Sequence, residues 1–232
     1  MKLVLQKLNN SKYIKDLYRK EAINCIKYPD NTRRAKENFF KLEALCYSSN
    51  QHDIFCANAQ KLAEHLQKNG KIKLANIFFA ELGKIYGAIG KTKLAEETIE
   101  KSIEISNCMG DQIHVMARLT DLEIIFKKGR NGKKLYTTLI RKIECGKQIL
   151  ENYELYEKNF NTISKRPANK NGIKIQMAFA YSDLADIIKH KRPNHSIKLL
   201  EKAKEIYKSL EKETEVKYLE KKIEYTKSKM SE

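Results

Sequence analysis

Four side chains of the types that bind zinc occur in one short stretch of the sequence. They are Cys46, His52, Cys56 and His65. Their gaps match no standard zinc-finger spacing, and the last two fall on an amphipathic segment that we expect to be helical. We therefore predict no metal site and interpret these side chains as buried or incidental.

Two pairs of side chains could act as an acid and a base, namely Asp111 with His114 and Asp183 with Asp186. Neither pair belongs to a recognisable catalytic motif, and no nucleophile is positioned beside one. Gly129 does not begin a phosphate-binding loop, because no strand precedes it and no Gly-Lys-Ser/Thr follows. We predict no catalytic residue, no cofactor and no enzymatic activity.

Positive charge is the most pronounced chemical feature of the chain. Its 232 residues include 46 Lys and Arg against 29 Asp and Glu, a net charge of +17. Two blocks carry most of the excess: residues 1–41 have 11 basic and 4 acidic side chains, and residues 127–174 have 13 and 4. Concentrated positive charge attracts phosphate backbones, anionic lipid heads and acidic protein segments alike. The alternative is a solvated, lysine-rich surface that reflects a biased genome composition, and the abundance of Asn and Ile beside Lys favours it.

Part of the second block surrounds a turn between two expected helices, so its charges converge in space. We predict that this anionic-partner patch consists of Lys127, Lys128, Arg130, Lys133 and Lys134. The other interpretation is a solvated turn with lysines placed favourably at a helix C-terminus. Tyr153, Tyr156 and Phe160 could stack on bases beside these charges. Their helical spacing favours packing in the core or against a partner helix.

The composition indicates a folded chain without a membrane span. Hydrophobic residues make up 41% and charged residues 32%, with only 9 Gly and 3 Pro, which excludes a collagen-like or largely disordered chain. No apolar run approaches the roughly 20 residues that cross a bilayer. Five cysteines without a Cys-x-x-Cys pair indicate isolated thiols in a reducing compartment. Because Lys7 and the polar residues after it end the first apolar run, we also expect no export signal. We predict a cytoplasmic protein.

Apolar residues recur at spacings of three and four almost throughout, which predicts an all-α chain of about nine or ten helices. Two helices are expected before residue 50, one after Ser11 and one from about residue 31. A polar loop is expected over residues 161–172. Breaks of two or three residues force neighbouring helices to run antiparallel. The later helices are expected at 53–69, 72–89, 92–108, 112–128, 133–160, 173–190, 194–210 and 213–229.

Residues 76–109 resemble a tetratricopeptide repeat (TPR). The positions that carry the resemblance are Phe79, Leu82, Gly83, Tyr86, Gly90, Ala95, Ile99 and Ser102. Gly83 and Ala95 allow two helices to approach closely, and Gly90 ends the first of them. Poorer repeats are expected at about 33–70, 112–160 and 173–211, with a capping helix at 213–229. We therefore predict one domain over residues 1–232, an α-solenoid of stacked antiparallel helical hairpins.

The resemblance implies a binding role, because proteins of this family usually hold a peptide or a partner helix in a concave groove lined by the first helix of each repeat. We predict a non-catalytic protein-interaction scaffold or adaptor. The alternative is a nucleic-acid-associated protein that uses basic blocks 1–41 and 127–174. The expected partner is a protein or peptide, acidic ones included, and in the alternative it is a nucleic acid. The groove positions that the family pattern gives are Ile77, Ala80, Lys84, Thr120, Lys127, Asp186 and Lys189, together with Gly87, Ala117, Ile124, Phe179 and Ser182.

Overall fold

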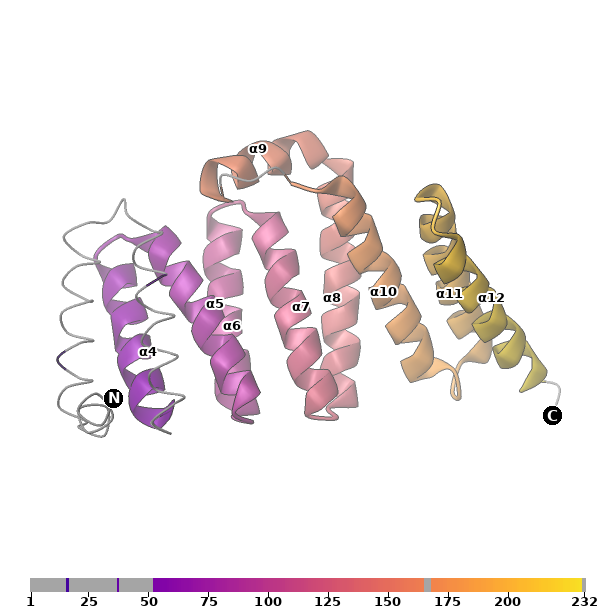
Figure 1. Cartoon of the computed structure of the whole chain (residues 1–232), viewed down its shortest axis with the longest axis horizontal. Helices are drawn as coiled ribbons and strands as arrows, with labels where there is room; N and C mark the ends of the chain where they lie inside the picture. The colour runs from indigo at the N-terminus through magenta and orange to yellow at the C-terminus, as the bar shows by residue number, and fades with distance from the viewer. Residues whose placement is uncertain (1–15, 17–36, 38–51, 165–167, 231–232) are drawn as a thin grey trace, which may run out of the picture. The chain divides into compact units, whose positions relative to one another are not determined.

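The computed structural model describes residues 16, 37, 52–164 and 168–230, and within these residues the chain forms α-helices and no strand (Figure 1). The all-α prediction is confirmed. The two helices expected before residue 50 and basic block 1–41 lie outside the described residues, apart from Asp16 and Glu37. The described helices are α4 (His52–Lys68), α5 (Ile72–Ala88), α6 (Thr92–Cys108), α7 (Gln112–Lys128), α8 (Gly132–Glu151), α9 (Tyr153–Ser164), α10 (Lys170–Ile188), α11 (Pro193–Ser209) and α12 (Glu213–Ser228).

The chain divides into two compact units, with the boundary between Ile105 and Ser106 inside α6. We describe each unit by itself, and the single domain over 1–232 stays a prediction. None of the described helices is long and apolar enough to span a bilayer.

In the first unit, α5 packs against α4 and, through a close approach at Gly83, against α6. A Cβ at Gly83 would overlap the side chain of Ile99, which is the role expected from the repeat pattern. The Ser102 hydroxyl donates a hydrogen bond of 2.5 Å to Oδ1 of buried Asn76. These contacts join α5 and α6 as a helical hairpin.

The turns after α4, α5 and α6 share one backbone conformation. Gly70, Gly90 and Gly110 have φ values of 73°, 81° and 67°, in the left-handed region that glycine adopts without steric cost. The residue after each glycine donates its N–H to a carbonyl five residues earlier, as Lys91 does to Tyr86 at 2.9 Å. Gly129 is the C-cap of α7, but it does not take the left-handed position of the turn that follows. Gly129 has a φ of −78°, and Arg130 takes the left-handed position with a φ of 52°.

We expect Arg130→Gly to stabilise the protein by about 0.5–1 kcal/mol, because a side chain in the left-handed region is sterically disfavoured. The matched control is Gly90→Ala, where a Cβ meets no atom within 4 Å but the backbone becomes strained. This control should lose about 1 kcal/mol. Urea unfolding midpoints measure both, and an Arg130→Gly variant that unfolds at lower urea than the wild type would contradict the strain at Arg130.

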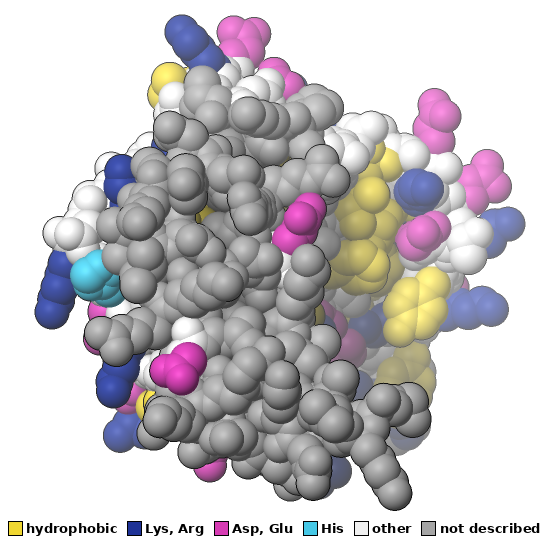
Figure 2. Space-filling view, turned by 60° about the vertical axis from the view of Figure 1, so that its left-hand side comes forward, with side chains coloured by type: hydrophobic (Ala, Val, Ile, Leu, Met, Phe, Trp, Pro, Cys, Tyr) yellow, Lys and Arg dark blue, Asp and Glu magenta, His cyan; other side chains and the backbone are white. Residues whose placement is uncertain are grey.

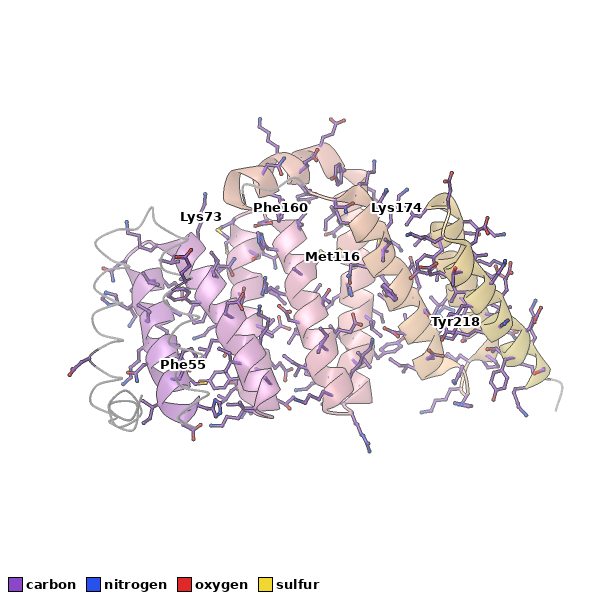
Figure 3. The ribbon with its side chains drawn as sticks, viewed as in Figure 1. Phe55, Lys73, Met116, Phe160, Lys174 and Tyr218 are labelled. Carbon is purple, nitrogen blue, oxygen red and sulfur yellow. The ribbon has the colours of Figure 1, made fainter. Side chains whose placement is uncertain are left out.

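In the second unit, α7 pairs with α8 and α10 pairs with α11, while α8 also packs directly on α10 and α11 on α12. Gly146 of α8 lies where this helix approaches α7 and α10. A Cβ there would lie 2.5 Å from Cγ of Met177 on α10 and 3.3 Å from Cε of Met116 on α7. Met116 is labelled in Figure 3. The second unit is therefore also built from stacked helical hairpins, as predicted.

The prediction of one helix over 133–160 and a loop over 161–172 is wrong. Helix α8 ends at Asn152, whose φ of −123° and ψ of 38° leave the helical region, and α9 crosses the ends of α7 and α8 (Figure 1). The Phe160 ring packs on His114 with centroids 5.1 Å apart, and Asn159 donates to the Gly110 carbonyl at 3.5 Å. Helix α9 continues to Ser164 and α10 begins at Lys170, so α9 lies beside the stack as an added helix.

The three described cysteines are thiols, with Cys56 and Cys145 buried and Cys108 exposed. Cys145 lies 3.4 Å from the carbonyl of Gln112, and burial raises the pKa of its thiol to about 12. A raised pKa lowers the fraction of the reactive thiolate at every pH below it.

At pH 8 we therefore expect iodoacetamide to modify Cys108 in the native protein and to leave Cys145 unmodified, since only about one Cys145 in ten thousand is a thiolate. Peptide mapping by mass spectrometry measures this. In urea both thiols should react. Equal native labelling of Cys108 and Cys145 would contradict the burial of Cys145.

Candidate functional site

Helices α7, α10 and α12 of the second unit are joined by polar side chains in a fixed register. The Thr120 hydroxyl lies 3.5 Å from Oε1 of Gln176, and Nζ of Lys127 lies 2.6 Å from Oδ2 of Asp183. Both contacts link residues 56 positions apart in sequence, so α7 and α10 run in the same direction. On the other side of α10, Lys222 of α12 donates to Ser182 at 3.1 Å and to Asp186 at 2.7 Å. The three helices therefore form one face, which we call the first-helix face.

A buried ion-pair network fixes this register. Lys142 of α8 is 1% exposed, and its Nζ donates to Oε2 of Glu123 and to Oε1 of Gln176, both at 2.7 Å. The other oxygen of Glu123 accepts from Lys127 at 2.7 Å, and Lys127 continues to Asp183. Two cations and two carboxylates thus connect α7, α8 and α10, and their charges balance.

The pKa values of this network show how burial and pairing compete. Burial alone would raise the pKa of the Glu123 carboxyl, but the attraction of Lys142 and Lys127 outweighs it and lowers the pKa. Burial would lower the pKa of Lys127, and its hydrogen bonds to Asp183 and Glu123 instead raise it. Burial raises the pKa of Asp183 despite its pairing with Lys127. Glu123 and Lys127 are consequently charged at neutral pH.

Removing one partner of the buried pair should be costly. We expect Lys142→Met to destabilise the protein by about 3 kcal/mol, because the buried Glu123 carboxylate loses a cation. The double variant Lys142→Met/Glu123→Leu should lose clearly less than the two single variants added together. Chemical denaturation of all four proteins gives the coupling free energy, and strictly additive losses would show that the pair is not coupled.

Three large apolar side chains stand exposed near one level of the first-helix face: Ile124 of α7, Phe179 of α10 and Tyr218 of α12, with exposed fractions of 58%, 51% and 60%. A second exposed tyrosine of α12, Tyr225 (58%), lies two turns further along the same side of that helix. Ile124 lies between Thr120 and Lys127 on α7, and Tyr218 lies one turn before Lys222 on α12. In the register set by the inter-helix contacts, all three lie at one level.

We call these three side chains the apolar row. The Phe179 ring meets Tyr207 edge-on with centroids 6.2 Å apart, and Nζ of Lys222 lies 5.5 Å from the centre of the Tyr218 ring. Figure 3 labels Tyr218 on α12. Two members of the row, Phe179 and Tyr218, are therefore in contact with neighbouring side chains.

Seven of the predicted groove residues fall into two groups. Thr120, Lys127, Asp186 and Lys189 lie on the first-helix face, and Lys189 is 3.7 Å from Asp186. The other three belong to α5 in the first unit. Ile77 is half-buried, Lys84 is exposed and pairs with Glu81 at 2.5 Å, and Ala80 is only 2% exposed. Because Ala80 has almost no surface to offer a partner, we leave it out of the proposed site.

Sequence reasoning placed Ile124 and Phe179 on this face and missed Tyr218. The sequence predicted only a capping helix over 213–229. In the structure Leu219 and Ile223 of α12 are buried, while Tyr218 and Tyr225 are exposed in a helix otherwise rich in Lys and Glu. These two tyrosines were the available signal.

The residues of the predicted anionic-partner patch lie at the turn between α7 and α8. Lys128, Arg130, Lys133 and Lys134 are exposed, and Nζ of Lys134 lies 5.8 Å from the centre of the Phe126 ring. Lys127 instead donates to Glu123 of its own helix and to Asp183 of α10. On the face drawn in Figure 2, dark blue basic and magenta acidic side chains are interspersed over the described surface.

The residues considered for base stacking and for acid–base chemistry have other contacts. Phe160 packs on His114, and the Tyr153 hydroxyl donates to Glu157 at 3.4 Å. Asp111 is buried, accepts the backbone N–H of His114 at the start of α7 and also contacts the His114 ring. Among the described residues, no group of three His, Cys, Asp or Glu side chains could hold a metal ion.

Comparison with known structures identifies the fold. The chain is similar to BtubC (BKLC) of P. vanneervenii, with a TM-score of 0.53 and 13% identity over 98% of this chain and 92% of that one. Two structures of a Podosopora anserina kinesin light chain with nearly identical TPR-like repeats also match. One of them, a single-residue variant, has a TM-score of 0.43 at 12% identity and covers 88% of this chain and 98% of that one. The other has a TM-score of 0.38 at 17% identity and covers 84% of this chain and 97% of that one.

No family model matches the chain, and no curated protein matches its sequence. The likeness to BtubC at 13% identity bears on the fold alone. Together with the hairpins of both units, it confirms a TPR-like fold of stacked helical hairpins.

Proposed function

We propose that this protein is a non-catalytic scaffold or adaptor that binds a peptide or a partner helix on the first-helix face. The apolar row is the observation that carries this proposal. Three large apolar side chains, each more than half exposed, lie at one level on three neighbouring helices. Large apolar side chains that gather exposed on one face mark candidate interaction sites.

The charged residues around the row support binding through apolar contact. Lys127 is held by Glu123 and Asp183, and Lys222 is held by Asp186. These lysines therefore hold the helices of the face in register with one another. The thiols of Cys56, Cys108 and Cys145 fit a reducing environment, so we propose that the protein acts in the cytoplasm.

The nucleic-acid alternative stays a prediction. Its first basic block, residues 1–41, lies almost wholly outside the described residues. Its second block contains Lys127 and Lys142, whose charges are balanced by Glu123 and Asp183.

Affinity capture from native lysate tests the proposal with a matched pair of variants. Ile124→Ser/Tyr218→Ser removes two side chains of the row, and Leu155→Ser removes an equally exposed leucine (57%) on α9. We expect the wild type and Leu155→Ser to retain the same discrete proteins after nuclease treatment, and the row variant to lose them by at least about tenfold. Circular dichroism should show the same helicity in all three.

Two outcomes would contradict the proposal. Retention of the same proteins by the row variant would place the binding surface elsewhere. Recovery that collapses on nuclease treatment, with co-eluting nucleic acid, would favour the basic blocks.

A further inference from the structure

From the exposed tyrosines and the charge pattern of α12, we infer that this helix docks antiparallel against α12 of a second copy of the chain and forms a weak homodimer with twofold symmetry. The partner is the same protein, so the inference is independent of the proposed function, although Tyr218 belongs to both surfaces. It follows from the exposed aromatic side of α12, from the distribution of its charges and from the way a single axis satisfies both.

One side of α12 is aromatic and exposed. The helix packs on α11 and buries Leu219 and Ile223, whereas Tyr218 and Tyr225 are 60% and 58% exposed. These tyrosines are seven residues apart, so they lie on the same side of the helix and about 10.5 Å apart along its axis. We call the surface formed by Tyr218 and Tyr225 the tyrosine side.

The charges of α12 are divided between its two halves. The helix contains four Glu and four Lys, so it carries no net charge within a chain of +17. Residues 213–220 hold three Glu and one Lys, a charge of −2, and residues 221–228 hold three Lys and one Glu, a charge of +2. Two copies of this helix side by side therefore attract each other when antiparallel and repel each other when parallel.

A twofold axis between residues 221 and 222 satisfies both properties at once. It places Tyr218 of each copy opposite Tyr225 of the other, and aromatic pairs of this kind stabilise interfaces. Lys217 and Glu224 are exposed and lie seven residues apart on one flank of the tyrosine side. The same axis brings Lys217 of each copy opposite Glu224 of the other, and every contact of a twofold interface occurs twice.

Lys221 limits the affinity of this contact. It is exposed and lies between Tyr218 and Tyr225 on the same side of α12, so the axis brings the two Lys221 ammonium groups toward each other. The contact is also short, because the 16 residues of the helix span about 24 Å. We therefore expect a weak, reversible dimer with a Kd on the order of 10–100 μM.

Sedimentation equilibrium of the purified full chain tests the inference. At about 150 mM NaCl, repulsion between the net charges of two copies is largely screened, and we expect a reversible equilibrium between monomer and dimer. Tyr225→Ser should raise the Kd of the dimer at least about tenfold. Ile124→Ser removes an equally exposed side chain on α7 (58%) and should leave the Kd within about twofold of the wild type. Circular dichroism should show equal helicity in all three proteins.

An exchange of charges measures the register. Lys217→Glu and Glu224→Lys should each raise the Kd at least about fivefold, because each places like charges opposite one another twice. In a parallel dimer either variant would only exchange one like pair for another. An equimolar mixture of the two variants should dimerise within about twofold of the wild type, since the unlike copies again oppose opposite charges. Glu205→Lys, the same change at an exposed position of α11, is the control and should leave the Kd unchanged.

A variant at the axis measures its position. Lys221→Leu should lower the Kd about tenfold, because it removes the two like charges that the axis brings together and adds apolar contact.

Several outcomes would overturn the inference. A chain that stays monomeric up to about 500 μM, far above the expected Kd, would do so, and so would a Kd that is unchanged in Tyr225→Ser. Charge variants that dimerise as the wild type does, a mixture no tighter than its components, or a Lys221→Leu variant that dimerises no more tightly would each contradict the antiparallel register. These measurements contain no other protein, so their failure would leave the proposed function untouched.

Discussion

The charge of Lys142 imposes the constraint on which the second unit depends. An ammonium group that is 1% exposed loses its hydration and must find acceptors within the fold. Lys142 finds one acceptor on α7 and one on α10, so both helices must lie at one height relative to α8. A shift of α10 by one turn would remove Gln176 from Lys142 and Asp183 from Lys127. Apolar packing tolerates such shifts much better, because it is not directional.

The apolar row is a consequence of that registration. Ile124 and Phe179 are brought to one level only because α7 and α10 are aligned by the contacts of Thr120 and Lys127. Lys222 does the same for Tyr218 of α12. The polar contacts thus set the geometry of the face, and Ile124, Phe179 and Tyr218 provide its exposed apolar surface. A net charge of +17 says little about this face, because its cations are matched locally by carboxylates.

Local signals explain what could be predicted from the sequence. Helix boundaries from residue 52 to 128 follow from glycines at 70, 90 and 110 and from apolar spacing, and the structure places them within a residue or two. Gly83 was recognisable because its neighbours match a repeat pattern. Ile124 and Phe179 followed from the same pattern. The left-handed conformation of Arg130 was not predictable, because the adjacent Gly129 has the higher intrinsic preference for it.

Features that depend on distant residues were not predictable. In the sequence Lys142 is one cation in a basic block, and its burial appears only when Glu123 and Gln176 are placed beside it. The break at Asn152 lies within a continuous apolar spacing, and the packing of Phe160 on His114 decides the direction of α9. Tyr218 became part of a surface only through the pairing of Lys222 with residues of α10.

Helix α9 has a consequence for how the fold can vary. Because α8 packs directly on α10, the stack closes without α9, which crosses the ends of α7 and α8 and contacts Lys170 at the start of α10. Equivalent residues of α7 and α10 are 56 positions apart, whereas α5 and α7 begin 40 positions apart, and the extra length is the excursion through α9. The segment between Asn152 and Asn169 is therefore a place where the chain can lengthen, shorten or diverge while the helices on either side keep their partners.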